Sequence, residues 1–145
     1  MLLIEILELE SNIKNSDWFS KNDLYVKIIY GSQIRRTTTL WNKNNPKWKQ
    51  AFVFNYSISD KIKFELYDAD KYSPDELLSK FYIDIVDEHS EVKEYNIKGL
   101  KINMGNVYYK SRNQYRNILE KNKINESKLN KIKKIIDNHI SSFKN

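Results

Sequence analysis

Residues 61–70 read Lys-Ile-Lys-Phe-Glu-Leu-Tyr-Asp-Ala-Asp, and this stretch carries the clearest structural signal in the sequence. Ile62, Phe64 and Leu66 alternate with charged residues, which is the two-residue period of a half-buried β-strand. The strand then runs directly into two aspartates that are separated by one residue. The stretch therefore predicts a strand that ends in an acidic loop.

The same alternation is found on both sides of this stretch. Residues 52–56 place aromatic side chains on one face of a preceding strand, and residues 81–85 place apolar side chains on one face of a following strand. Gly31-Ser32 lies where a tight hairpin would join two strands. Because no helical pattern separates the strands, we expect an all-β, eight-stranded antiparallel β-sandwich. The remaining strands are expected at residues 2–10, 24–30, 33–41, 93–98 and 105–112.

The pattern changes after Arg112. From Leu129 to Phe143 apolar residues recur at helical spacing among lysines, and Asn125 or Ser127 is a candidate N-cap, which predicts a C-terminal amphipathic basic α-helix. Residues 1–112 carry 17 basic and 16 acidic side chains, whereas residues 113–145 carry 8 and 3. We therefore expect a near-neutral β domain at 1–112 and a basic helical tail at 113–145. The apolar stripe of the tail would dock on the sandwich or on a second copy of the chain, or bind a membrane surface or an acidic partner.

The composition excludes several classes of function. The 145 residues include no cysteine, which rules out disulfides, thiolate metal sites and cysteine nucleophiles and suits a reducing, cytoplasmic compartment. No apolar run has the length of a membrane span. His89 and His139 are the only histidines, and neither belongs to a recognisable catalytic constellation, so we do not expect an enzyme. Nucleic-acid binding by the basic tail is not favoured either, because no known module is present.

Acidic residues gather in two of the expected loops. Asp17 and Asp23 flank the first long loop, and Asp68, Asp70 and Glu76 punctuate another. Isolated loop acids usually serve only solvation, but acids from two loops at the same end of a sandwich would converge. Two carboxylates about 4 Å apart repel by roughly 4 kcal/mol at an effective dielectric of 20, so such a cluster needs raised pKa values or a cation. Oxygen ligands without histidine or cysteine suit Ca²⁺.

The order of these motifs resembles that of the C2 domain, the calcium- and phospholipid-binding sandwich of protein kinase C and synaptotagmin. The resemblance spans residues 2–112 and implies the circularly permuted topology called type II. The matching segments are 17–27, close to the family's D-x5-D-P-Y-V-K; 37–39 and 45–48, similar to its threonine strand followed by N-P-x-W; 52–54, its F-x-F; and 66–78, similar to its Y-D-x-D loop.

The resemblance implies a calcium site and names its ligands. Leu24 stands where the family usually has proline, and the last ligand is a glutamate where aspartate is commoner. The implied Ca²⁺ ligands are Asp17, Asp23, Asp68, Asp70 and Glu76.

The resemblance also implies contact with a membrane. Trp18, Phe19 and Tyr72 fall where family members insert side chains into lipid, and burying one such ring contributes roughly 2–3 kcal/mol. The expected function is calcium-dependent binding to anionic phospholipid membranes by a cytoplasmic, peripheral membrane protein, with a protein partner or self-association through the tail. The alternative is a calcium-independent C2-like module for protein–protein interaction or structure. The residues expected to contact lipid headgroups are Arg35, Arg36, Lys43, Lys47 and Lys71.

Overall fold

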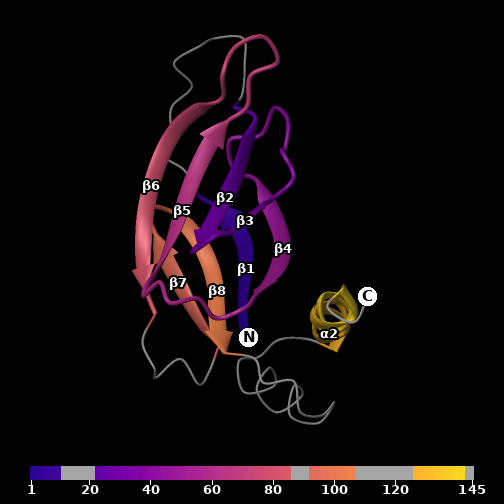
Figure 1. Ribbon diagram of the computed structural model, residues 1–145. Coiled ribbons are helices and arrows are strands. Elements are labelled where there is room, and N and C mark those ends of the chain that lie inside the picture. Colours follow the sequence, from indigo (N-terminus) through magenta and orange to yellow (C-terminus); the bar gives the residue numbers. More distant parts are fainter. Residues whose placement is uncertain (11–21, 86–91, 107–125, 143–145) are drawn as a thin grey trace.

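Two four-stranded antiparallel sheets face each other as a sandwich (Figure 1). The computed structural model describes residues 1–10, 22–85, 92–106 and 126–142. Sheet 1 has the strand order β4-β1-β8-β7 and sheet 2 the order β3-β2-β5-β6. The strands are β1 (Leu2–Leu9), β2 (Leu24–Tyr30), β3 (Gln33–Arg36), β4 (Lys47–Phe54), β5 (Lys61–Asp68), β6 (Glu76–Asp84), β7 (Lys93–Ile97) and β8 (Leu100–Asn106).

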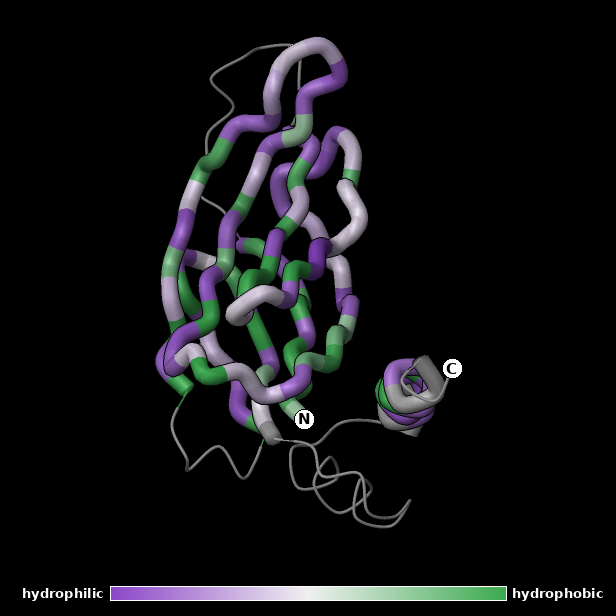
Figure 2. The backbone as a smooth tube through the Cα atoms, viewed as in Figure 1, coloured by the Kyte–Doolittle hydropathy of each residue, from purple (hydrophilic) through white to green (hydrophobic). Residues whose placement is uncertain are grey.

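The alternating apolar side chains fill the space between the sheets, as the sequence predicts. Ile4 of β1 and Ile28 of β2 are fully buried there, together with Phe54, Phe64 and Ile102. Figure 2 shows hydrophobic residues, in green, alternating with hydrophilic ones along these strands. The expected antiparallel sandwich is therefore confirmed.

The permuted strand order places the first and last strands of the sandwich side by side. Leu2 pairs with Phe54 of β4 on one side and with Asn106 of β8 on the other, so β1 lies inside sheet 1. In sheet 2, Leu24 pairs with Asp68, which brings the start of β2 next to the end of β5. The latter pairing joins two of the acidic segments.

Several expected strands have different limits in the structure. The strand expected at 52–56 is β4, which runs from Lys47 to Phe54, and the strand expected at 81–85 is β6, which begins at Glu76. The strand predicted at 33–41 ends at Arg36, because Thr37 turns inward: its hydroxyl oxygen accepts the amide hydrogen of Val26 at 2.9 Å. The sequence predicts the last strand at 105–112, but β8 begins at Leu100, after a turn in which Gly99 has φ +84°. A Cβ at Gly99 would lie 2.2 Å from the carbonyl oxygen of Glu10, so this turn needs glycine. The expected Gly31 hairpin is confirmed, with φ +59°.

The predicted C-terminal helix is α2 (Glu126–Ser142). Ile132 and Ile136 are 2% and 0% exposed and pack with Leu3 and Val53. Since neighbouring residues of β1 point to opposite faces, Leu3 lies on the outer face of sheet 1, away from the sandwich interior. Of the alternatives for the apolar stripe, docking on the sandwich is therefore the one observed. As for the caps, Ser127 lies within the helix, and Asn125 lies outside the described residues.

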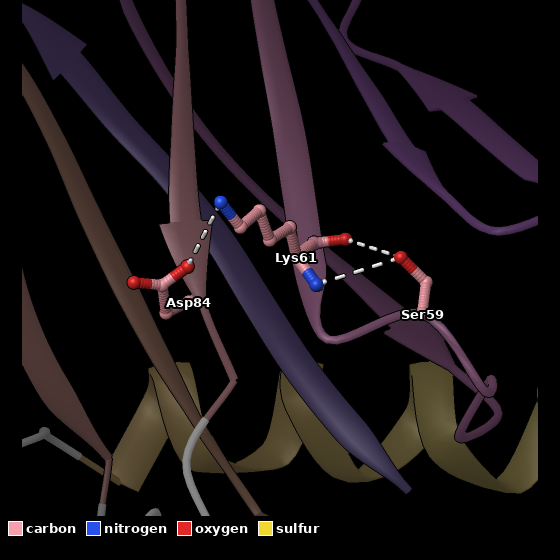
Figure 3. A network of polar contacts seen from close by, with 3 residues as sticks. All are labelled: Ser59, Lys61 and Asp84. Atoms are coloured by element: carbon pink, nitrogen blue, oxygen red, sulfur yellow. Dashed lines mark hydrogen bonds and ion pairs between the residues drawn. The ribbon is translucent and has the colours of Figure 1, made fainter.

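Ser59, Lys61 and Asp84 form polar contacts at the end of the sandwich near α2 (Figure 3). Lys61 and Asp84 form the terminal pair of β5 and β6, with Nζ and Oδ1 3.9 Å apart. The Ser59 hydroxyl donates to the carbonyl oxygen of Lys61 at 3.0 Å. No helix in the described part of the chain combines the length and apolarity needed to cross a membrane.

Candidate functional site

Residues 22–23, 37–46 and 69–75 meet at the end of the sandwich that lies away from α2 (Figure 1). We call residues 10–23 the first loop, residues 37–46 the second loop and residues 69–75 the third loop. Within the first, only residues 10, 22 and 23 belong to the described part of the chain.

Asp23 connects the three loops. Its carboxylate accepts the amide hydrogen of Asn42, in the second loop, at 2.7 Å. Its carbonyl oxygen accepts the amide hydrogen of Ala69, in the third loop, also at 2.7 Å. The expectation that the acidic loops lie together therefore holds for the described residues.

Asp68 lies directly beside Asp23. The amide hydrogen of Asp23 is donated to Oδ1 of Asp68 at 2.8 Å, and both side chains are half-buried. Asp68 is the last residue of β5, so the sheet fixes its backbone, while its carboxylate reaches the first loop. Asp17, the other predicted ligand of the first loop, lies outside the described residues.

Asp70 organises the third loop around its carboxylate. Its Oδ1 accepts the amide hydrogen of Tyr72 at 2.9 Å, and its Oδ2 accepts the hydroxyl hydrogen of Ser73 at 2.5 Å. These bonds, the Ser73 one foremost, hold the pKa of Asp70 below its usual value. Asp70 therefore keeps its negative charge to a lower pH than an ordinary aspartate does.

Asp75 is a site residue that the sequence prediction missed. Its Oδ1 accepts the amide hydrogen of Asp70 at 3.1 Å, and its Oδ2 accepts the hydroxyl hydrogen of Tyr25 at 2.5 Å. The bond from Tyr25 is the main cause that lowers the pKa of Asp75. Burial, followed by the same bond, raises the pKa of Tyr25 to about 12. Both groups thus keep the charge state in which tyrosine donates and aspartate accepts.

Glu76, the predicted last ligand, is the residue after Asp75 and the first of β6, where it pairs with Asp68. Its side chain is exposed. The sequence prediction chose Glu76 as the last ligand because it lies six residues after Asp70. Asp75 is only one residue nearer, so the spacing alone does not show which of the two acids is the ligand. The Asp75-Glu76 pair itself is the signal that both acids need consideration.

The donor set of this end fits a hard cation. Two hydrogen bonds link the described acidic residues: the Asp23 amide donates to the carboxylate of Asp68, and the Asp70 amide donates to the carboxylate of Asp75. Oxygen atoms such as theirs are the ligands that Ca²⁺ prefers. None of these four forms an ion pair with a described lysine or arginine. The ion pairs of the described residues join Lys61 to Asp84, Lys63 to Glu65, and Lys101 to Glu8.

These four acidic residues do not by themselves complete a metal centre. Among the described residues, no group of three or more histidine, cysteine, aspartate or glutamate side chains is arranged to hold an ion. Since Asp17 lies outside those residues, the observed arrangement supplies part of the predicted ligand set.

Exposed aromatic side chains lie at the same end. Tyr72, predicted to insert into lipid, is 98% exposed on the third loop. Trp41 on the second loop is 47% exposed, and Nζ of Lys71 lies 5.1 Å from the centroid of its ring. The sequence prediction missed Trp41, although a tryptophan between a threonine strand and an Asn-Pro turn was a visible signal. Trp18 and Phe19 lie outside the described residues.

The five basic residues predicted to bind headgroups are not brought together. Arg35 lies over the ring of Phe54 at 5.9 Å, whereas Arg36 lies over the ring of Tyr25 at 3.5 Å, on the other face of sheet 2. Lys47 begins β4 in sheet 1. Only Lys43 and Lys71 belong to the loop end, where the Lys43 amide hydrogen is donated to the carbonyl oxygen of Asn22 at 3.0 Å.

A comparison with known protein families identifies the fold. The C2 domain family matches residues 2–98, which is more than half of the chain. This chain belongs to the C2 domain family. Membership supports membrane or lipid binding as the general kind of function, and the C2 fold is a binding module.

Relatives of this C2 domain occur in larger proteins. Perforin-1 of Homo sapiens is 35% identical over 65 residues, which cover 43% of this chain and 12% of perforin-1. Perforin-1 of Mus musculus is 34% identical over the same length and covers the same shares. The chain thus spans about an eighth of the length of these relatives.

Solved structures share the fold. A C2 domain of plant Extended Synaptotagmin 1 superimposes with a TM-score of 0.62 at 16% identity, covering 74% of this chain and 95% of that one. Human GIVD cytosolic phospholipase A2 has a TM-score of 0.63 at 22% identity, covering 71% of this chain and 16% of the phospholipase. The calcium-bound pair of C2 domains of Extended-Synaptotagmin 2 has a TM-score of 0.59 at 20% identity, covering 72% of this chain and 44% of that one.

Proposed function

We propose that this C2 domain binds anionic phospholipid membranes in a calcium-dependent manner, through the three loops at one end of the sandwich. The observation that carries the proposal is the meeting of these loops around Asp23. There four acidic residues, Asp23, Asp68, Asp70 and Asp75, lie without an ion-paired lysine or arginine from the described residues. The exposed rings of Trp41 and Tyr72 lie at the same end.

The residues proposed to hold Ca²⁺ are those of the predicted set, with one addition. Asp23, Asp68, Asp70 and Asp75 would contribute oxygens from the described residues, and Asp17 and Glu76 would complete the set. When bound, the ion would neutralise these carboxylates and offer free coordination positions to lipid phosphates. The calcium-bound state of Extended-Synaptotagmin 2, which shares the fold, supports this part of the proposal.

The chain's own residues would then seat the loops in the headgroup layer. Trp41 and Tyr72 each have an apolar ring with a polar atom, which is the combination favoured at a membrane–water interface. Trp18 and Phe19 of the first loop are proposed to act with them. Lys43 and Lys71 would meet lipid phosphates, and each such contact contributes about 1 kcal/mol. The proposed place of action is the cytoplasmic surface of a membrane, which is consistent with a chain that has no cysteine.

Vesicle co-sedimentation tests the proposal. With phosphatidylserine-containing vesicles, we expect the protein to sediment in the presence of Ca²⁺ and to remain in the supernatant with a chelator. Vesicles of phosphatidylcholine alone serve as the control for surface charge, and we expect little binding to them. Equal binding with calcium and with chelator would contradict the calcium dependence.

The second candidate function is a calcium-independent C2 module that binds a protein. It is favoured by the lack, among the described residues, of a group of three ligand side chains poised for a metal. The same co-sedimentation experiment separates the two candidates, because this module would not respond to calcium.

Trp41 provides a more local test. Replacing Trp41 by alanine removes a half-exposed ring from the second loop, and loss of about 1.4 kcal/mol of interfacial burial would weaken vesicle binding roughly tenfold. The measurement is the vesicle concentration at half-maximal binding, at saturating calcium. Tyr82→Ala is the matched control, because Tyr82 is 54% exposed on β6, outside the three loops. Equal losses in the two variants would argue against a role for the second loop.

A further inference from the structure

Tyr25 lies directly below the loop end, two residues after Asp23, and is held on both sides. The side chain is 6% exposed, on the face of sheet 2 that points away from the core. From β3, the guanidinium carbon of Arg36 lies 3.5 Å from the centroid of its ring. From β5, the ring of Tyr67 stacks on it with centroids 5.3 Å apart and planes at 12°. Because β2 lies between these strands, the tyrosine ring has little freedom to move.

Arg36 is itself fixed in this arrangement. Its Nη2 donates to Oγ1 of Thr39 at 2.8 Å, and its Nε donates to the carbonyl oxygen of Thr37 at 3.3 Å. Because these hydrogen bonds hold the guanidinium in place, its cation–π contact supports the ring of Tyr25 from the edge of the sheet. Arg36 thus has a structural task here that is separate from its predicted contact with a lipid headgroup.

The hydroxyl of the fixed ring reaches the third loop. It donates to Oδ2 of Asp75 at 2.5 Å, while Oδ1 of the same carboxylate accepts the amide hydrogen of Asp70 at 3.1 Å. Asp70 in turn accepts hydrogens from Tyr72 and Ser73. A continuous series of hydrogen bonds therefore runs from the rigid sheet through Asp75 to the tip of the third loop.

We propose that Tyr25 is a positioning residue: its hydroxyl holds Asp75, and through Asp75 it sets the shape of the third loop before any cation binds. The effect of Tyr25 on the shape of the loop does not require an ion. Its effect on the strength of calcium binding rests on the proposed function. Residues that orient ligand carboxylates from behind typically change metal affinity by 10–100-fold. Arranging the loop in advance also lowers the entropy lost when an ion binds.

The decisive variant is Tyr25→Phe, which removes the hydroxyl and keeps the ring between Arg36 and Tyr67. Tyr67→Phe is the matched control, since it removes a hydroxyl from the stacking partner, outside the third loop. In the presence of a chelator, we expect amide hydrogen exchange at Asp70 and Tyr72 to become several-fold faster in Tyr25→Phe. The control and the core amides of β5 should keep the wild-type rates, which shows that the sandwich is folded.

Calcium titration by calorimetry supplies the second measurement. We expect the Kd for Ca²⁺ to rise about tenfold in Tyr25→Phe and to stay unchanged in Tyr67→Phe. Unchanged exchange in the third loop would overturn the proposal. Faster exchange with an unchanged Kd would support the effect of Tyr25 on the shape of the loop and would overturn its effect on calcium affinity. If the wild-type protein binds no calcium, the proposed function fails, and the exchange measurement alone decides whether Tyr25 shapes the loop.

Discussion

Calcium should raise the melting temperature of the wild-type domain, and the Asp68→Asn, Asp70→Asn double variant should lose this increase. At a free calcium concentration 100 times Kd, binding stabilises a folded protein by about 2.7 kcal/mol, which is the effect expected to disappear. The apo fold should persist, because asparagine keeps an oxygen that can accept the amide hydrogens of Asp23 and Tyr72. Differential scanning calorimetry with calcium and with chelator measures the effect.

A second double variant controls for the change in charge. Asp60→Asn with Asp84→Asn also removes two exposed carboxylates, but from the opposite end of the sandwich. We expect it to keep the full calcium-induced shift. If both double variants respond to calcium as the wild type does, Asp68 and Asp70 are not ligands.

The other large effect is expected from the helix. Ile136 is fully buried between α2 and sheet 1, so Ile136→Ala should lower the free energy of unfolding by about 2–5 kcal/mol. The loss combines the apolar surface that is no longer buried with the cavity left against Leu3 and Val53. Chemical denaturation followed by tryptophan fluorescence measures it.

Lys134→Ala provides the matched control, because Lys134 is exposed on the same helix and the replacement keeps helix propensity. We expect it to change stability by less than about 0.5 kcal/mol. Equal stability of Ile136→Ala and Lys134→Ala would show that α2 is not docked in solution.

Deleting residues 113–145 should leave the sandwich folded but less stable, since the interior cluster around Ile4 and Phe64 does not include α2.

The sequence predicts the strands well where burial alternates along the chain. Residues 61–68 illustrate this, because every second side chain faces the core and the period is therefore visible. The helix is likewise predicted by the spacing of Ile132 and Ile136. The start of β8 was missed although a local signal exists: Lys98-Gly99 forms a two-residue hairpin turn with positive φ at both positions, between Ile97 and Leu100.

The candidate site was predicted in part. Spacing along the chain identified Asp23, Asp68 and Asp70, which the structure brings to one end. It could not distinguish Asp75 from Glu76, because the difference depends on where β6 begins and on the hydroxyl of Tyr25. The alternation that predicts the strands gives no exposure for Trp41, because this residue lies in the second loop, where its ring is beside Lys71 of the third loop.

The position of α2 sets how far apart two charged surfaces of the molecule lie. The helix packs near the start of β1, whereas the acidic loops follow its end, and a strand of this length spans about 25 Å. That separation is about three Debye lengths at physiological ionic strength, so Lys131 and Lys134 on the helix scarcely feel charges at the loops. A molecule whose loops rest on one bilayer would therefore hold these lysines clear of it, available to a second negatively charged body on the far side.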